Sequence, residues 1–203
     1  MPEFERRVFG ARKMPSATDR CRCSDRPNSI DTTRRGCQRE GVRLIPLPAD
    51  TYHALADGDL AAANRVAPVE LTPYFVNPRW LPGWGRASAR VRADPGVADW
   101  LAGAIAGPDG VVGRAGYHGP PDERSAVEVT YEIEPAWRRR GYARAALNAL
   151  VARAVGEPGV HSVRAVIRPH NTASRRLVVT SGFIETGEEL PDGPWVVYER
   201  ALP

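Results

Sequence analysis

The segment of residues 127–155 constrains the fold more than any other part of the sequence. Apolar side chains at positions 127, 129, 131 and 133 alternate with polar ones, a pattern typical of a strand with one buried face. Pro135 ends this strand, and after a short arginine-rich loop a helix begins near Gly141 and carries an apolar stripe to Val155. A strand, a loop and an amphipathic helix in immediate succession predict a domain in which helices cover a sheet.

The rest of the sequence from residue 42 onward alternates between strand and helix patterns. Further strands are predicted at 42–47, 100–105, 111–117, 162–168 and 195–198, and further helices at 49–60, 86–93 and 171–181. Turn residues at 108–110 and 191–193 indicate two hairpins, and the proline-rich stretch 68–85 is expected to break regular structure. We therefore predict an α+β (α/β-type) domain without internal repeats.

Residues 1–41 differ from the rest of the chain in charge and pattern. They hold ten Lys+Arg against six Asp+Glu, so the whole net charge of +4 lies there, while residues 42–203 carry eighteen of each. Without a sustained hydrophobic period, such a segment buries too little apolar surface to offset the entropy of ordering. We predict a disordered Arg-rich tail at 1–41 and a folded domain at 42–203. The further hypothesis that Val42 is a misread GTG start codon is tested by N-terminal sequencing of the native protein.

Composition argues against several classes of protein. The sequence has no run of about 18 uncharged apolar residues and no apolar secretion segment in its first thirty residues, so we expect no membrane contact and a cytoplasmic location. Cys21, Cys23 and Cys37 lack paired C-x-x-C spacing with nearby histidines, so no metal site is predicted. Nucleic-acid binding is limited to the basic tail. The sequence has 27 arginines and a single lysine, Lys13. GC-rich codon usage explains this bias, so we expect a bacterial source.

The loop Arg138-Arg139-Arg140-Gly141-Tyr142-Ala143 is the most informative segment for function. Gly141 has no side chain to block close approach, and Ala143 is nearly as small. The first turn of the following helix offers unpaired N–H groups and the positive end of the helix dipole, which suits a pyrophosphate. The three arginines then act as secondary clamps, and a solvated basic loop is the alternative. The P-loop and the dinucleotide-binding G-x-G-x-x-G pattern are both absent from the sequence.

The motif Arg138-x-x-Gly141-x-Ala143 resembles the Q/R-x-x-G-x-G/A loop of the GCN5-related N-acetyltransferase (GNAT) superfamily. A second match follows about thirty residues downstream, where Asn171-Thr172-Ala173-Ser174 and Ser181-Gly182-Phe183 resemble the N-x-x-S and G-F pattern of that family. The resemblance covers residues 42–203 and is strongest to the ribosomal-protein-alanine acetyltransferase-like branch. It implies a mixed, mostly antiparallel twisted sheet flanked by helices, splayed between the fourth and fifth strands.

The resemblance also implies acetyl-CoA as cosubstrate, without a metal, and a set of residues that bind it. These are Tyr131, Ile133, Arg138, Arg139, Arg140, Gly141, Tyr142, Ala143, Asn171 and Ser174. Pantetheine is expected between the splayed strands, with backbone N–H groups around Ile133 facing the thioester oxygen. The Asn171 amide is expected to pair with pantetheine, and capping of the helix is the alternative.

Two catalytic residues follow from the resemblance. Glu128 occupies the strand position at which some relatives have a catalytic glutamate, and it is predicted to be the base. Glu132 is the reserve candidate for the same role. The alternative is that both glutamates only form the polar face of a half-exposed strand. Relatives often carry a tyrosine four residues before the helix-ending glycine, but this chain has Val178 there. Ser174 is therefore predicted to hydrogen-bond the sulfur, with a surface serine as the alternative. Arg175 and Arg176 either reach the 3′-phosphate of CoA or are solvated.

The amine acceptor is expected to bind among aromatic residues. The candidates for the wall of that pocket are Tyr74, Phe75, Trp80, Trp84 and Trp100, for which core packing is the alternative, whereas His118 is left as a loop histidine. We predict an N-acetyltransferase in which a primary amine of a small molecule or a protein N-terminus attacks acetyl-CoA directly. The alternatives are a catalytically weak acyl-CoA-binding module and nucleic-acid binding through the tail. An exposed final strand at 195–198 is expected to permit a homodimer.

Overall fold

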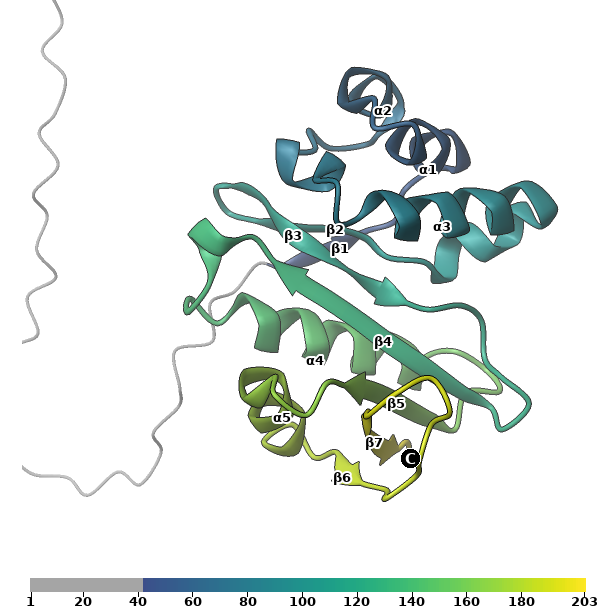
Figure 1. Ribbon diagram of the computed structural model, residues 1–203, viewed down its shortest axis with the longest axis vertical. Coiled ribbons are helices and arrows are strands. Elements are labelled where there is room, and N and C mark those ends of the chain that lie inside the picture. The colour runs from purple at the N-terminus through teal and green to yellow at the C-terminus, as the bar shows by residue number, and fades with distance from the viewer. Residues whose placement is uncertain (1–41) are drawn as a thin grey trace, which may run out of the picture. The chain divides into compact units, whose positions relative to one another are not determined.

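The computed structural model describes residues 42–203, so the predicted disordered tail and the proposed start at Val42 concern a segment outside the described residues. Seven strands form one sheet in the order β1-β2-β3-β4-β5-β7-β6 (Figure 1). The strands are β1 (Arg43–Ile45), β2 (Gly103–Gly107), β3 (Gly110–Tyr117), β4 (Ala126–Ile133), β5 (Ser162–Ile167), β6 (Ile184–Glu185) and β7 (Val196–Ala201). The helices and strands thus form the mixed domain that the sequence predicts.

Helices cover both faces of the sheet (Figure 1). Those on one face are α1 (Ala49–Ala56), α2 (Leu60–Val66) and α3 (Leu81–Ala93), and those on the other are α4 (Tyr142–Val155) and α5 (Thr172–Val179). Each face has its own apolar core, one around Leu55, Phe75 and Trp84, the other around Leu147 and Leu150. Short 3-10 turns, η1 (Pro73–Val76), η2 (Pro95–Trp100) and η3 (Pro135–Trp137), connect these elements.

Strands β4 and β5 diverge after a short parallel pairing. Every other strand pair is antiparallel, whereas β4 and β5 pair in parallel, and only from Ala126 opposite Ser162 to Glu128 opposite Arg164. Beyond Glu128, β4 runs on to Ile133 without β5 beside it. The predicted mostly antiparallel sheet with a splay between the fourth and fifth strands is therefore confirmed.

Two helix predictions are corrected. The single helix predicted at 49–60 is two helices, because Gly58 adopts a φ of +73° and the Asp59 side chain caps a new helix by accepting from the Ala62 amide. Helix α3 begins at Leu81 rather than at Arg86, even though Pro82 lies in its first turn. A proline is tolerated there because the first turn of a helix needs no N–H donor.

The final strand is not an exposed edge, contrary to the sequence prediction. β7 lies between β5, which pairs with all six of its residues, and β6. The edge at this end is the two-residue β6, where Ile184 is 75% exposed. The predicted homodimer depended on an exposed strand at 195–198, and β7 is not available for that pairing.

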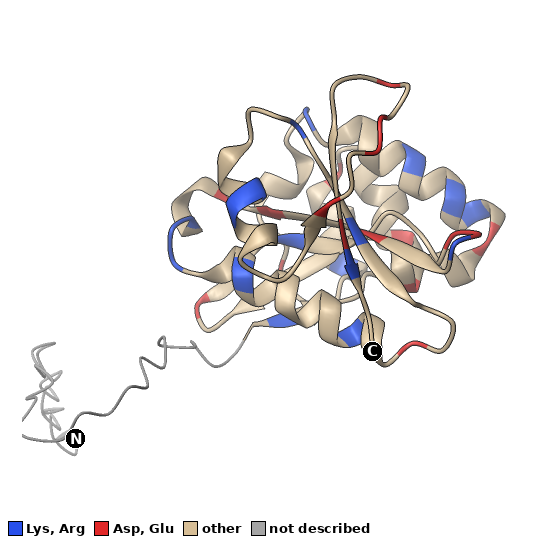
Figure 2. Cartoon of the chain, turned by 90° about the horizontal axis from the view of Figure 1, so that it is seen from below, with Lys and Arg blue, Asp and Glu red and all other residues tan. Residues whose placement is uncertain are grey.

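The distribution of charged residues and the apolar character of the helices can be read from the described part of the chain. Basic and acidic residues are interspersed over this part of the chain rather than separated into two halves (Figure 2). No helix within residues 42–203 is both long and apolar enough to cross a lipid bilayer.

Candidate active site

The splay leaves backbone groups of β4 without a partner strand. The Glu134 amide donates to the Val112 carbonyl at 3.0 Å, and the Glu128 carbonyl accepts from His118 at 2.8 Å, so even-numbered residues of β4 turn their backbone groups toward β3. Odd-numbered residues alternate to the other edge. The N–H groups of Tyr131 and Ile133 therefore face the splay, where sequence analysis expected donors for a thioester oxygen.

Two adjoining cavities occupy the region beside this edge. One, of about 450 Å³, lies between β4 and β5 and reaches Trp195. The other, of about 730 Å³, extends from β4 over the loop that contains Gly141 to α5. Tyr131, Asn171 and Ser174 line both cavities and so mark their junction. An elongated ligand that enters over the loop can continue past these three residues into the splay.

The loop before α4 has the geometry of an anion cradle. Gly141 adopts a φ of +86°, and nothing lies within 4 Å of the place where a Cβ would stand. The hydrogen-bond ladder of α4 starts with the Ala145 amide, which donates to the Gly141 carbonyl at 3.1 Å. The amides of the first helical turn, including those of Tyr142 and Ala143, thus lack intrahelical partners. Tyr142 and Ala143 line the larger cavity, where the sequence analysis expects a pyrophosphate.

The three arginines of this loop do not act alike. Arg138 turns back to β4, where its Nε donates to the Ile133 carbonyl and its Nη2 to Glu132 Oε1, both at 3.0 Å. Arg140 stacks on Trp137 with its guanidinium carbon 4.9 Å from the ring centroid. Arg139 is exposed and adopts a φ of +63°. Arg138 therefore fixes the loop against the strand. Of the other two arginines, Arg139 lines the larger cavity and Arg140 does not.

Tyr142 takes part in the site through its backbone. Its side chain is 2% exposed and packs edge-on against Trp137, with ring centroids 6.2 Å apart. This packing holds the first turn of α4 against the sheet. The ring belongs to the apolar core between α4 and the sheet, so only the amide of Tyr142 remains for a ligand.

The junction of the two cavities holds an unusual hydroxyl. The oxygen of Tyr131 is buried and forms no well-aligned hydrogen bond with the described residues, but the Ser174 hydroxyl lies close enough to act on it. Burial raises the pKa of Tyr131, and the Ser174 hydroxyl partly offsets that rise. Asn171 caps α5, since its Oδ1 accepts from the Ser174 amide at 3.2 Å, which leaves its amide nitrogen for a ligand. The capping alternative for Asn171 is thus observed, together with a place at the cavity junction.

Glu128 lies on the face of β4 that is turned toward α3. Its Oε1 is 3.6 Å from Nε2 of His118, and the side chains are 38% and 62% exposed. The register of β3 and β4 brings the two residues together although they are ten positions apart in the sequence. From the sequence alone His118 is only a loop histidine, because no local pattern reveals the β3–β4 pairing that brings it next to Glu128.

Glu132, the reserve candidate for the base, is surrounded by hydrogen-bond donors. Its Oε1 accepts from the Tyr74 hydroxyl at 3.2 Å and from Arg138 at 3.0 Å, with Arg79 at 3.6 Å. These neighbours already occupy the Glu132 Oε1 atom, so it offers an approaching amine less room than an uncontacted carboxylate oxygen would. Its role is to tie the segment around Tyr74 to the phosphate-loop side of β4.

The other residues that the sequence analysis considers near the cofactor or the acceptor have structural contacts of their own. Val178 is fully buried, so no residue replaces the usual tyrosine at that point of the fold. Arg175 donates to the Tyr198 hydroxyl at 2.8 Å and lies 3.5 Å from Glu185, so its partly exposed side chain already has partners within the fold. Phe75 and Trp84 stack in the core at 6.1 Å, in agreement with the packing alternative.

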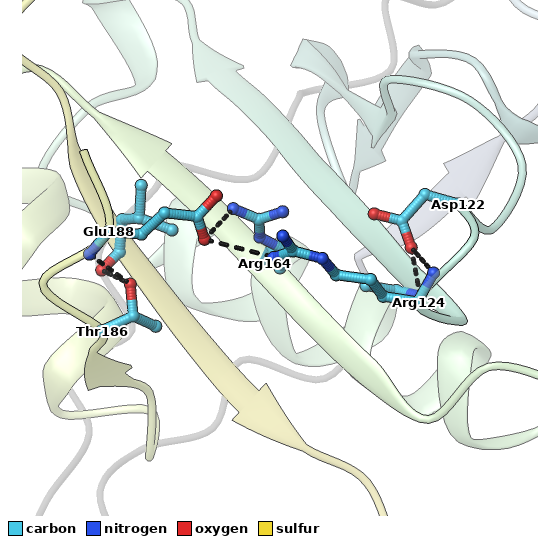
Figure 3. Close-up of polar contacts among 7 residues, drawn as sticks. Asp122, Arg124, Arg164, Thr186 and Glu188 are labelled. Carbon is cyan, nitrogen blue, oxygen red and sulfur yellow. Dashed lines mark hydrogen bonds and ion pairs between the residues drawn. The ribbon is translucent and has the colours of Figure 1, made fainter. Parts of the chain in front are cut away.

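A polar cluster on the strand next to Glu128 joins two arginines to one glutamate. Arg164, opposite Glu128 in the parallel pairing, donates to Glu188 Oε2 at 2.7 Å, and Arg124 lies 3.6 Å from the same oxygen. Figure 3 shows Glu188 reaching from the segment after β6 toward both guanidinium groups. The cluster holds that segment against β5. Within residues 42–203, no group of three or more His, Cys, Asp or Glu side chains is arranged to hold a metal ion.

Comparisons with known proteins agree with this geometry. The family model described as an acetyltransferase (GNAT) domain matches residues 48–184, more than half of the chain. An uncharacterized N-acetyltransferase of Bacillus subtilis strain 168, YoaA, is 30% identical over 77 residues, a match that covers 38% of this chain and 44% of that relative. The chain thus spans less than half the length of this relative.

Solved structures of low identity share the fold. A ribosomal-protein-S5-alanine acetyltransferase from Vibrio fischeri has a TM-score of 0.51 and 17% identity, over 79% of this chain and 91% of that one. The microcin C7 self-immunity acetyltransferase MccE, solved with acetyl-CoA and AMP, has a TM-score of 0.54 and 12% identity, over 80% and 93%. At such identities the likeness concerns the fold alone.

Proposed function

The chain belongs to the GNAT acetyltransferase family, and from that premise we propose that it transfers the acetyl group of acetyl-CoA to a primary amine. The observation that carries the proposal is the continuous pair of cavities from the open Gly141 loop to the splay. The narrower assignment to the ribosomal-protein-alanine acetyltransferase-like branch stays a prediction, because the V. fischeri enzyme is one neighbour beside the immunity acetyltransferase.

The residues at the cavities fit acetyl-CoA. Free amides of the first turn of α4 suit the pyrophosphate, and the absence of a side chain at Gly141 allows it to come close. Asn171 offers its amide nitrogen, and Tyr131 and Ile133 offer backbone N–H groups along the splay, which suits the amides and the carbonyl of an extended thiol arm. When bound, acetyl-CoA supplies an acetyl group activated as a thioester.

Glu128 is the proposed base. As the amine nitrogen forms its bond to the acetyl carbon and the carbon–sulfur bond breaks, one proton leaves the nitrogen and another reaches the sulfur. The half-exposed Glu128 carboxylate can accept the first, directly or through water, and the His118 ring lies 3.6 Å from that carboxylate. A base needs a carboxylate that the amine can reach. Glu128 has the His118 ring as its neighbour, whereas Tyr74, Arg138 and Arg79 surround Glu132.

Ser174 and Tyr131 are the proposed source of the proton for the departing thiolate. Both line the junction through which the thiol arm must pass, and the buried Tyr131 hydroxyl has no other partner in the part of the chain that is described. A hydroxyl donor at this place serves the purpose of the tyrosine that Val178 replaces.

A binding module that keeps the cradle without turnover is the second candidate function, favoured by the buried Val178 at the position of the usual acid. Two measurements on the full chain decide between the candidates. Acetyl-CoA at a hundredfold over its dissociation constant should stabilise the fold by about 2.7 kcal/mol in thermal unfolding. Release of free CoA with any primary amine then supports the enzyme, stabilisation without turnover supports the module, and no stabilisation at millimolar acetyl-CoA rejects both.

Location and assembly are parts of the proposal that rest on sequence expectations alone. We place the enzyme in the cytoplasm of a bacterium, where acetyl-CoA is available, and assign it no nucleic-acid partner. A homodimer remains a prediction that size-exclusion chromatography with light scattering can test.

A further inference from the structure

A third cavity lies between α3 and β3, on the face of the sheet opposite to α4. It measures about 220 Å³, and its walls combine apolar side chains such as Trp84 and Leu101 with basic ones. The basic residues are Arg86, Arg90, Arg114 and His118, and no aspartate or glutamate lines the cavity. We refer to it as the arginine cavity.

The arginines of this cavity lack the carboxylate partners that other arginines of the fold possess. Arg164, Arg138 and Arg153 each lie within 4.0 Å of a glutamate oxygen. Neither Arg86, Arg90 nor Arg114 forms such a pair with any residue between 42 and 203, and Arg90 instead donates to the His118 carbonyl. Three arginines thus line one cavity, and none of them has a carboxylate oxygen of the described residues within 4.0 Å of its nitrogens. The Glu132 carboxylate acts on Arg114 from farther away and favours its charged form.

Arg114 is the most desolvated of the three. Its guanidinium stacks on Trp80 at 3.9 Å and approaches Trp84 at 5.2 Å, and its Nε is buried without a partner. Burial lowers the pKa of Arg114 to about 10, so the group is charged at neutral pH at a cost in solvation. Glu132, its neighbour across the strands, is bound by Arg138 and Arg79 instead. An anion in the cavity would restore the missing interaction.

The arginine cavity adjoins the proposed reaction centre on two sides. Thr130 lines both this cavity and the one between β4 and β5. Arg90 and His118 also line a neighbouring cavity of about 200 Å³ that contains Glu128. A molecule whose amine lies between Glu128 and the splay can therefore extend its other end among the arginines.

We propose that the arginine cavity is an acceptor subsite for anionic oxygens, so that this enzyme acts on primary amines that also carry a carboxylate or a phosphate. The inference rests on the proposed function, since it names the acceptor class of the same site. Guanidinium groups bind both anions through paired, charge-assisted N–H donors, while a polyamine would bring further positive charge against three arginines. The apolar walls suit a short hydrocarbon chain between amine and anion.

The test compares acceptors that differ only in the end remote from the amine. The panel consists of 6-aminohexanoate, 6-aminohexanamide and 1,6-diaminohexane, with 6-aminohexyl phosphate to separate phosphate from carboxylate. With the full chain and saturating acetyl-CoA, we expect kcat/KM for an anionic amine to exceed that for the neutral amide by about tenfold or more. The diamine should be the poorest acceptor, and the higher of the two anionic rates identifies the preferred anion.

Variants assign the preference to the cavity. Arg114→Gln and Arg86→Gln should each reduce the ratio of anionic to neutral acceptor rates severalfold, and Arg86 is exposed, so its replacement leaves the fold intact. Arg92→Gln is the matched control, because Arg92 lies on the same helix, is exposed and does not line the cavity. A diamine preference, or an anion preference that survives both variants, overturns the inference.

Binding separates this inference from the proposed function. Calorimetric titration of 6-aminohexanoate, 6-aminohexyl phosphate and 6-aminohexanamide into the CoA-saturated chain should show tighter binding of an anionic amine, and Arg86→Gln should remove that difference. If no amine is acetylated, the subsite is still supported when the anionic amines bind more tightly than 6-aminohexanamide and this difference depends on Arg86. Equal dissociation constants for the anionic amines and the amide overturn the inference. If acetyl-CoA itself fails to bind, the proposed function is rejected, and the same titrations without CoA judge the cavity.

Discussion

His118 and Glu128 face each other across the β3–β4 pair, with 3.6 Å between Nε2 of the histidine and Oε1 of the carboxylate. At that distance the imidazole is a neighbour of the carboxylate rather than a hydrogen-bond donor to it, so the half-exposed Glu128 is not enclosed in donors. Glu132, two pleats further along the same face of β4, is instead bound by Tyr74 and Arg138. One strand face thus carries a carboxylate available for chemistry and one used for structure.

Glu128→Gln should therefore lower turnover by about 100-fold or more while leaving acetyl-CoA affinity within a few-fold, because an amide cannot accept the amine proton. Steady-state kinetics over a range of pH, together with the acetyl-CoA-induced melting shift, provide the measurement. Glu123→Gln, an exposed glutamate in the loop before β4, is the matched control. Activity that is unchanged at every pH would remove Glu128 from the role of base.

Gly141→Glu should abolish the stabilisation by acetyl-CoA, since a carboxylate would fill the open space above the first turn of α4 and repel the pyrophosphate. Gly159→Glu is a close control for backbone strain. Gly159 adopts a φ of +82° against +86° at Gly141, and both have nothing within 4 Å of a Cβ. Both variants should lose intrinsic stability to a similar extent, but only Gly141→Glu should lose the melting shift. Equal shifts in the two variants would contradict the pyrophosphate assignment.

Tyr131→Phe should reduce kcat by about 10- to 100-fold with little change in the KM for acetyl-CoA, if the hydroxyl protonates the departing thiolate. The fold itself should lose little stability, because the removed hydroxyl forms no well-aligned hydrogen bond and its neighbour Ser174 is partly exposed, so the serine hydroxyl can turn to water. Ser174→Ala is measured beside it. A fall in kcat confined to Ser174→Ala would assign the proton to the serine, and a rise in KM alone would make Tyr131 only a cofactor contact.

The sequence was sufficient for the parts of the site that depend on local chemistry. The Gly141 loop, the Asn171 cap and the Gly182 turn, whose φ is +84°, are each fixed by residues close together in the chain. The partners of Arg138 and Glu128 depend instead on how strands and turns align, which no local period determines. The arginine cavity is an extreme case, since it joins α3 to β3 through residues 28 positions apart, such as Arg90 and His118.

Helix α3 shows the same limit for secondary structure. Its first five residues include a proline and two glycines, and intrinsic propensity counts against a helix there. Tertiary packing reverses that preference, because Trp84 stacks on Phe75 and donates its Nε1–H to the Phe75 carbonyl at 2.7 Å. Those contacts join positions nine residues apart and become visible only in the folded chain.

Two glycines of the acceptor side should respond oppositely to alanine. A Cβ at Gly116 would come within 2.4 Å of the Leu101 carbonyl oxygen and 2.5 Å of the Ala102 Cα, both backbone atoms in the segment that walls the arginine cavity. Gly116→Ala must push that segment away and should cost about 1–3 kcal/mol of stability. Gly85, in the exposed part of α3, has nothing within 4 Å of a Cβ, so Gly85→Ala should stabilise the fold by about 0.5–1 kcal/mol through helix propensity.

Denaturant unfolding of both variants measures these free energies directly. Because the Leu101–Ala102 segment walls the arginine cavity, Gly116→Ala should also weaken the preference for anionic acceptors, whereas Gly85→Ala should leave it unchanged. If Gly116→Ala proves neutral in stability, the close approach of Leu101 to β3 is not a feature of the folded protein. The shape of the cavity that depends on that approach would then need to be revised.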